Sequence, residues 1–130
     1  MIKVAAAILV KDGRILIAKR LPSDKLANKW EFPGGKLKPG ESPEECLRRE
    51  MQEEFQVEVS VERFFCDSRY RYEHADIYLM AYIARLIKGE LVPTCHAEYR
   101  WVTVDELVKY DFAPADKPVV AKLRAERVIL

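Results

Sequence analysis

Short apolar runs separated by polar turns predict that strands make up much of this chain. The runs from Ile2 to Val10 and from Arg14 to Lys19 flank Lys11-Asp12-Gly13, an arrangement typical of a β-hairpin. Ile77 to Leu86 is apolar and rich in β-forming residues, which predicts a central strand. Shorter extended segments are predicted at residues 57–65, 68–73 and Arg100 to Thr103.

A different spacing begins at residue 42, where apolar positions recur every three to four residues. Ser42 and Glu45 can form a capping box, and Pro43 fits the first helical position. We therefore expect a helix from near Ser42 to about Phe55. One face of this helix is apolar and should pack against the core, through Leu47, Met51 and Phe55.

Two more helices are predicted towards the end of the chain. Thr103 with Glu106 forms another capping box, for a helix to about Lys109. A last helix should run from near Lys117 to Arg127. Strands and helices in this irregular order predict an α+β fold with a mixed sheet between helices.

Composition favours one domain and excludes several classes of protein. With 49% hydrophobic content, residues 1–130 should form a single domain with a sizeable core. Lys and Arg total 22 against 21 acidic residues, so binding to a nucleic acid polymer is not expected. The apolar stretch from Val4 to Val10 is too short to span a membrane, and Met1-Ile2-Lys3 precedes it without a signal-peptide pattern. A cytoplasmic protein without a membrane partner is expected.

Five chemically distinctive side chains are expected to be structural. Cys46, Cys66 and Cys95 lack a metal-type spacing and are odd in number. This pattern fits reduced thiols that serve as small apolar residues without a catalytic role. Trp30 and Phe32 should pack in the core beside the glycines that follow them.

Three carboxylates gather on the predicted helix that follows residue 42. At roughly 100° per residue, Glu50, Glu53 and Glu54 fall within about a quarter turn of one another. Like charges one turn apart cost an isolated helix a few tenths of a kcal/mol, and a cation would relieve that repulsion. Mg²⁺ is the natural candidate because it takes oxygen ligands from carboxylates, phosphates and water. The alternative is a solvated acidic surface in which Arg49 pairs with its neighbours, although Gly35 ahead of the helix favours the metal site.

The segment from Gly35 to Val57 resembles the signature of the Nudix hydrolases, Mg²⁺-dependent enzymes that cleave nucleoside diphosphates linked to another group. The match covers the first glycine and every charged position of the family pattern, namely Gly35, Glu41, Arg49, Glu50, Glu53 and Glu54. One position departs, because Gln56 stands where the family usually has glycine. Gln56 should adopt the left-handed conformation at a cost of roughly 1 kcal/mol, or the helix should end differently. The resemblance implies an α/β/α sandwich.

The resemblance also implies roles for residues in this segment and beside it. The carbonyl of Gly34 would join Glu50 and Glu54 in binding Mg²⁺, for which Mn²⁺ can substitute. Glu53 would orient or deprotonate the attacking water. Arg49, one helical turn earlier, would hold Glu53.

A further carboxylate ligand is expected from outside the segment. Glu98, on the approach to Trp101, is the candidate. A carboxylate of this kind more often lies exposed in a loop than binds a metal. The alternatives to it are Glu90, Glu73 and Asp76.

Residues towards both ends of the chain are similar to the MutT-type branch of the family, which hydrolyses nucleoside triphosphates. Arg20 matches an arginine that holds phosphate in that branch, with a solvated surface arginine as the alternative. The segment 111–119 resembles the one that reads the base, and Asp116 makes it similar to relatives that act on CTP and modified deoxycytidine triphosphates. Asp116 is also well suited to cap the last helix. Tyr72 is a candidate to stack on the base or to pack across strands.

The expected reaction is hydrolysis of a nucleoside triphosphate to a nucleoside monophosphate and pyrophosphate, with CTP, modified dCTP or 8-oxo-dGTP as substrate in nucleotide-pool sanitising. A second interpretation is hydrolysis of ADP-ribose or a dinucleoside polyphosphate, and a third is a non-catalytic nucleotide sensor. Ala115-Asp116 and the lack of a long insertion favour a single base, and the complete set of carboxylates disfavours the sensor. The sequence is compatible with a monomer or a homodimer.

Overall fold

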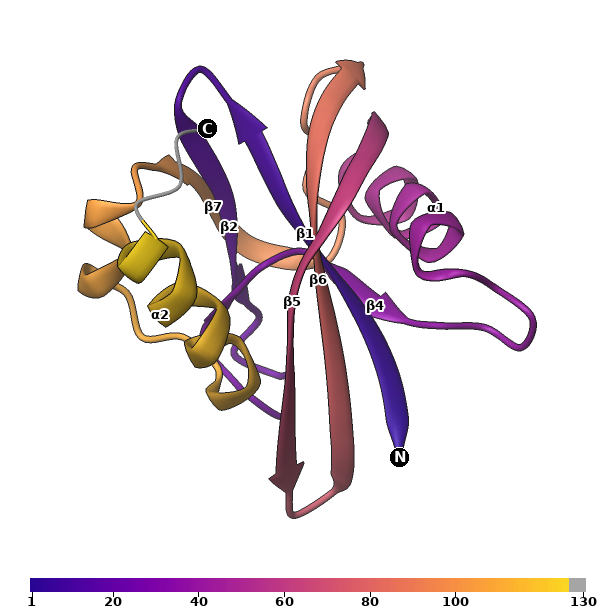
Figure 1. Ribbon diagram of the computed structural model, residues 1–130, viewed down its shortest axis with the longest axis vertical. Coiled ribbons are helices and arrows are strands. Elements are labelled where there is room, and N and C mark those ends of the chain that lie inside the picture. Colours follow the sequence, from indigo (N-terminus) through magenta and orange to yellow (C-terminus); the bar gives the residue numbers. More distant parts are fainter. Residues whose placement is uncertain (127–130) are drawn as a thin grey trace.

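The computed structural model describes residues 1–126 and contains a β-sheet with a helix on each face (Figure 1). Within these residues the strands are β1 (Ile2–Lys11), β2 (Arg14–Arg20), β3 (Trp30–Glu31), β4 (Gly34–Lys36), β5 (Glu58–Tyr72), β6 (Ala75–Lys88) and β7 (His96–Val102). The helices are α1 (Pro43–Phe55) and α2 (Lys117–Glu126), with short 3-10 helices η1 (Asp105–Lys109) and η2 (Pro114–Asp116). None of these helices is long and apolar enough to cross a membrane.

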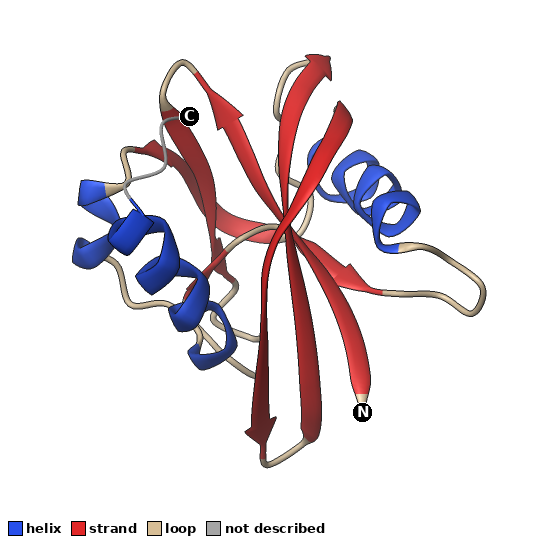
Figure 2. Cartoon of the chain, viewed as in Figure 1, coloured by secondary structure: helices blue, strands red, loops and turns tan. Residues whose placement is uncertain are grey.

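β1 lies inside a mixed sheet, which Figure 2 shows with its helices on either side. It pairs in parallel with β6 from Ile2 to Val10, and antiparallel with β2 and β4. β5 pairs antiparallel with β6, while β3 and β7 pair antiparallel with β2. The predicted mixed sheet is therefore confirmed.

Most predicted strands are present, with changes in their limits. Asp12 (φ 50°) and Gly13 (φ 75°) make the turn between β1 and β2, as a hairpin with two left-handed turn residues requires. The predicted strands at residues 57–65 and 68–73 form one strand, β5, whose register against β6 shifts in its first half, between Glu58 and Cys66. β6 lies between β1 and β5, which confirms a central strand over Ile77 to Leu86.

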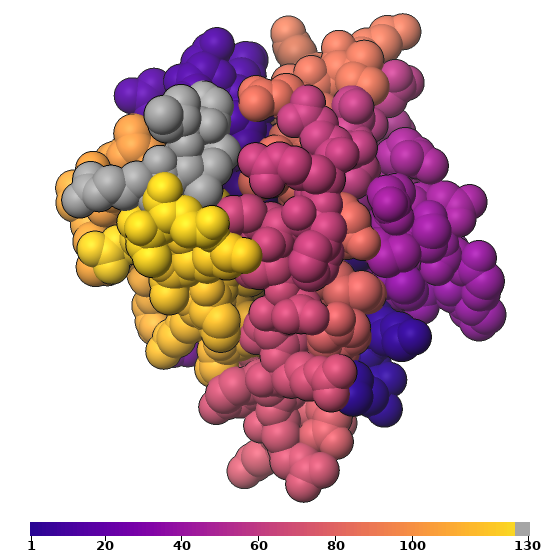
Figure 3. Space-filling view, in the orientation of Figure 1, coloured from indigo at the N-terminus to yellow at the C-terminus, as the bar shows by residue number. Residues whose placement is uncertain are grey.

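The core occupies both faces of the sheet, because alternate residues of a strand point in opposite directions. Along β1 the odd-numbered residues from Ala5 to Leu9 pack with α1, and the even-numbered residues from Ala6 to Val10 pack with α2 and η1. α1 buries Leu47, Met51 and Phe55, as its spacing predicts. In the space-filling view of Figure 3, β5 separates the yellow α2 from the purple α1. The arrangement is the α/β/α sandwich that the resemblance implied.

The ends of α1 are built as the sequence predicts. Ser42 accepts a hydrogen bond from the Glu45 amide, and the Glu45 carboxylate accepts one from the Ser42 amide. Gln56 adopts the left-handed conformation, with φ 59° and ψ 37°, and ends the helix. The departure from glycine at this position therefore leaves the helix end intact.

The helices after β7 agree less closely with the prediction. Thr103 and Glu106 exchange the predicted hydrogen bonds, but the helix that contains Glu106 is the 3-10 helix η1 rather than an α-helix. α2 begins at Lys117 as predicted and runs to Glu126. The predicted last residue, Arg127, lies outside the described residues.

Candidate active site

Arg49 ties the carboxylates of α1 to the loop before the helix. Its guanidinium donates to Glu41 at 2.8 and 2.9 Å and lowers the pKa of Glu41 to about 2. It also donates to Glu50 at 2.6 Å and to Glu53 at 3.2 Å, so the predicted pair one turn apart is present. A further bond, to the Lys36 carbonyl at 3.1 Å, fixes the guanidinium against β4. One arginine therefore holds three carboxylates in position.

Two glycines of β4 allow the backbone to pass close to these groups. Gly34 has φ 153°, and a Cβ atom there would lie 1.9 Å from the Ala5 carbonyl oxygen. A Cβ atom on Gly35 would lie 2.6 Å from the carboxyl carbon of Glu50. A larger residue at Gly34 would collide with the backbone of β1, so that position requires glycine, whereas a larger residue at Gly35 would displace the Glu50 carboxylate.

Glu54 differs from its neighbours because its carboxylate is buried without a cation beside it. Burial raises the pKa of Glu54 well above its usual range, and the carboxylates of Glu50 and Glu31 add to the rise. Among the described residues, no hydrogen-bond donor reaches the Glu54 Oε1 atom. A buried ionised carboxylate with no partner is costly, and a divalent cation would remove that cost. The oxygen donors of Glu50 and Glu54 suit Mg²⁺.

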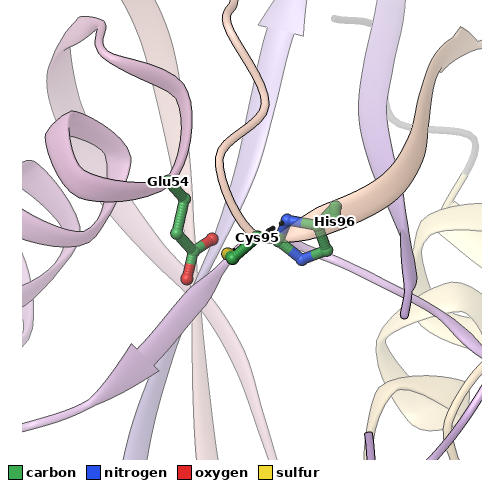
Figure 4. Close-up of side chains that lie close together, drawn as sticks. All are labelled: Glu54, Cys95 and His96. Atoms are coloured by element: carbon green, nitrogen blue, oxygen red, sulfur yellow. Dashed lines mark hydrogen bonds between the residues drawn. The ribbon is translucent and has the colours of Figure 1, made fainter. Parts of the chain in front are cut away.

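The loop between β6 and β7 brings two further side chains to Glu54. The amides of Val92 and Thr94 donate to the last carbonyls of α1, on Phe55 and Glu54, at 2.9 Å each. Cys95 and His96 follow directly, and their ligand atoms lie within 4.8 Å of one another and of the Glu54 carboxylate (Figure 4). Cys95 is exposed, so the expectation that all three cysteines serve as small apolar residues does not describe this one.

Sequence reasoning missed this pair. The signal was the adjacency of a cysteine and a histidine, which are both metal-ligating residue types. Nothing in the spacing placed them beside α1, because the contact is made by loop amides more than 35 residues away in the chain. Cys46, by contrast, is fully buried as expected.

The structure does not bring Glu98 to this group. Tyr99 packs on the α1 side of the sheet, so Glu98 and Arg100 alternate to the other face, where they bond to each other at 2.7 Å. A bulge where β7 meets the end of β2 shifts the alternation before Glu98. His96 therefore faces α1, where its ring stacks on Phe55 at 5.4 Å.

Arg20 and Glu31 form the next part of the site. Arg20 donates to Glu31 Oε1 at 2.9 Å, and the Nε2 atom of His96 lies 2.8 Å from Glu31 Oε2. The Arg20 side chain is 29% exposed, so it is not the freely solvated arginine of the alternative interpretation. Sequence reasoning did not single out Glu31, which links Arg20 to His96.

The segment before α2 docks onto β3. The Trp30 amide donates to the Asp111 carbonyl and the Ala113 amide donates to the Trp30 carbonyl, both at 2.9 Å. Tyr72 accepts a hydrogen bond from the Ala115 amide at 2.8 Å through its hydroxyl oxygen. Trp30 is buried, as predicted.

Asp116 is buried at the end of this segment. Its Oδ1 atom accepts a hydrogen bond from the Phe32 amide at 3.2 Å. Burial raises the pKa of Asp116 well above its usual range, and the Glu31 carboxylate adds to the rise. Its described hydrogen bond therefore goes across the fold to the residue that follows β3, although Asp116 directly precedes α2.

A cavity of about 640 Å³, a size typical of small-molecule sites, lies beside these groups. Of the three α1 carboxylates, Glu54 lines it, whereas Glu50 and Glu53 are not among its lining residues. The cavity extends from Glu54 to Asp116. The predicted site residues and their neighbours in this lining are Arg20, Glu31, Gly34, Gly35, Glu54, Tyr72, Cys95, His96 and Asp116.

The chain matches known proteins over most of its length. A model of the NUDIX domain matches residues 1–123. The chain is 35% identical to a CTP pyrophosphohydrolase of Escherichia coli (strain K12) over 127 residues, which cover 98% of this chain and 94% of the relative. It is also 35% identical to an 8-oxo-dGTP diphosphatase of the same strain over 116 residues, 88% of each protein.

Solved structures show the same fold. The solution structure of the E. coli ORF135 protein matches with a TM-score of 0.85 at 35% identity, covering 98% of this chain and 91% of that one. A MutT protein from methicillin-resistant Staphylococcus aureus 252 matches with a TM-score of 0.77 at 34% identity, covering 96% of each chain.

Proposed function

We propose a reaction for this chain from the premise that it belongs to the Nudix family of hydrolases, which act on phosphoric anhydride bonds. In this reaction a nucleoside triphosphate and water give a nucleoside monophosphate and pyrophosphate. The observation that carries the proposal is the buried carboxylate of Glu54, without a hydrogen-bond partner for Oε1 among the described residues, on a cavity that also reaches Asp116. A site of this kind combines a place for a cation with a place for a base.

Glu50, Glu54 and the carbonyl of Gly34 are the proposed ligands of a divalent cation, Mg²⁺ or in its place Mn²⁺. When bound, such a cation polarises phosphate oxygens and lowers the pKa of water. Gly35 supports this assignment because a larger residue there would displace the Glu50 carboxylate. The charge repulsion between Glu50 and Glu54 supports it as well, since a cation would turn that repulsion into attraction.

Glu53 is the proposed general base. Its side chain is 55% exposed, so water reaches it, while its bond to Arg49 limits its motion. Arg49 also holds Glu50, so the base and a metal ligand keep a fixed relative position. This geometry fits a carboxylate that accepts the proton of an attacking water.

Arg20, Tyr72 and Asp116 are proposed to bind the substrate. Arg20 lines the cavity and carries the fork of donors that phosphate oxygens accept. Tyr72 lines it too, and its hydroxyl fixes the segment that bears Asp116. Asp116 is the candidate for reading the polar edge of the base.

CTP, modified dCTP and 8-oxo-dGTP are the proposed substrates. The names of the two E. coli relatives support this class, and the cavity of about 640 Å³ is of a size for one nucleotide. Hydrolysis of ADP-ribose or a dinucleoside polyphosphate would need space for a second bulky group. A non-catalytic sensor would not need Glu53 and its bond to Arg49.

A substrate screen tests the proposal. Canonical and damaged triphosphates, ADP-ribose and a dinucleoside polyphosphate are incubated with the protein and Mg²⁺, and pyrophosphate and orthophosphate are measured separately. We expect pyrophosphate and a nucleoside monophosphate in equal amounts from a cytosine or oxoguanine triphosphate. Orthophosphate as the first product, faster turnover of a dinucleotide, or no turnover of any compound would contradict the proposal.

A further inference from the structure

We propose that Glu54, Cys95 and His96 form a binding site for a thiophilic divalent cation such as Zn²⁺. The site is distinct in chemistry from the oxygen-ligand site assigned to Mg²⁺, with which it shares Glu54. Binding of the cation stands independently of the proposed function. Only its inhibitory consequence, given below, rests on that function.

The three ligand atoms already lie together. They come from the end of α1, from the loop before β7 and from the first residue of β7, and all are within 4.8 Å of one another. The Cys95 sulfur lies 3.6 Å from His96 Nδ1. Ligand atoms of a tetrahedral zinc site are about 3.5 Å apart, so modest side-chain rotation completes the geometry.

The histidine ring is held in the orientation that a metal ligand needs. Its Nε2 atom lies 2.8 Å from Glu31 Oε2, and the ring stacks on Phe55 with an interplanar angle of 9°. A carboxylate that accepts the Nε2 proton leaves the lone pair on Nδ1, which is the atom next to Cys95. In metal-binding histidines, the N–H of the second ring nitrogen characteristically donates a hydrogen bond to a carboxylate in this way.

The Glu54 carboxylate points independently to a ligand at this place. It is 9% exposed, and its Oε1 atom has no partner among residues 1–126. In Figure 4 this carboxylate points towards the Cys95 side chain, with His96 beyond it. A buried oxygen without a donor, beside a sulfur and a nitrogen ligand, is the arrangement that a cation would satisfy.

The donor types select the cation. Thiolate and imidazole favour Zn²⁺ and similar metals, whereas Mg²⁺ prefers oxygen ligands throughout. Binding forms a sulfur to metal bond and releases the Cys95 thiol proton to solvent. Zn²⁺ and Mg²⁺ would share the Glu54 carboxylate, and the positive charge of one cation opposes binding of the other at so short a distance. Zn²⁺ at this site should therefore inhibit hydrolysis competitively with Mg²⁺.

Cobalt spectroscopy tests the site without any substrate. Co²⁺ alone is added to the metal-free protein, and a thiolate to cobalt charge-transfer band with intense visible bands of tetrahedral cobalt is expected at one equivalent. Zn²⁺ should abolish these bands. Cys95→Ser should remove the charge-transfer band and weaken Zn²⁺ binding at least about tenfold, whereas the control Cys66→Ser should keep both.

Inhibition is then measured for each variant as a fraction of its own activity with Mg²⁺. Cys95→Ser should need at least about tenfold more Zn²⁺ than Cys66→Ser for half inhibition. Absence of a charge-transfer band in the wild-type protein, or an unchanged spectrum in Cys95→Ser, overturns the site. If the bands appear but no triphosphate is hydrolysed, the site stands and the proposed hydrolase function is wrong.

Discussion

α1 and the segment before α2 contribute to one cavity in opposite ways. The carboxylates of α1 are arranged by the helix itself, through a capping box and an arginine one turn from its partner. Asp116 and Tyr72, which line the same cavity, are held by hydrogen bonds between distant parts of the chain, to Phe32 and to Ala115 respectively. The proposed catalytic groups thus depend on local spacing, whereas the proposed base-reading groups depend on the whole fold. Changes in the two regions should therefore have different consequences.

The largest effect is expected on α1. Glu53→Gln keeps the shape of the side chain but removes the base, so kcat should fall by about 10²–10⁴-fold with little change in KM. Steady-state kinetics with CTP measure this loss. The exposed Glu58→Gln on β5 is the control, and an unaltered kcat in Glu53→Gln would remove Glu53 from the mechanism.

Replacement of the proposed metal ligands should change the cation requirement. Glu50→Gln or Glu54→Gln is expected to raise the Mg²⁺ concentration for half-maximal activity by about tenfold or more. In the metal-free protein, Glu54→Gln should hold or raise the melting temperature, because it removes a buried carboxylate that lacks a cation. Lower stability together with an unchanged Mg²⁺ requirement would show that these carboxylates are structural.

At Asp116 the expected loss is smaller and depends on the base. Asp116→Ala leaves the base edge unpaired, so kcat/KM for the preferred substrate should fall roughly 5–150-fold. This factor corresponds to a loss of about 1–3 kcal/mol in transition-state binding. Asp111→Ala, in the same segment but exposed, is the control. If Asp116→Ala loses only thermal stability, Asp116 is a structural residue and the base is read elsewhere.

The raised pKa of Asp116 predicts a pH effect on stability. The folded protein binds the Asp116 proton more tightly than the unfolded chain does, and this difference stabilises the fold. The stabilisation is fully present below the ordinary pKa of 3.8 and is lost as pH rises through the raised pKa of the folded state. Asp116→Asn cannot ionise, so its melting temperature relative to the wild type should increase from pH 4.5 to pH 8. A difference that does not vary with pH would show that Asp116 ionises normally.

The smallest effect concerns the end of α1. Gln56 is exposed and left-handed, so Gln56→Gly should stabilise the protein by up to about 1 kcal/mol. Gln52→Gly, in the interior of the same helix, should cost about 1 kcal/mol. Denaturant unfolding of the two variants measures both, and equal effects would contradict the assignment of the helix end.

The same division explains how far the sequence predicted the structure. α1, its caps and the pairing of Arg49 with Glu53 follow from residue spacing alone, and they are present. Glu98 and His96 could not be placed in this way, because a bulge in β7 decides which of them faces α1. The approach of Cys95 to Glu54 also depends on a loop that caps a distant helix. Residues whose positions depend on tertiary contacts leave no periodic pattern in the sequence.

The most direct test of the central claim is kcat/KM for a panel of CTP, UTP, dCTP and 8-oxo-dGTP, measured for the wild type, Glu53→Gln and Asp116→Ala. The account predicts that Glu53→Gln loses rate by the same factor for every triphosphate, because the helix performs the chemistry. It predicts that Asp116→Ala changes the ranking of the bases. A changed ranking in Glu53→Gln, or a uniform loss in Asp116→Ala, would contradict the division of the site into a catalytic helix and a base-reading segment.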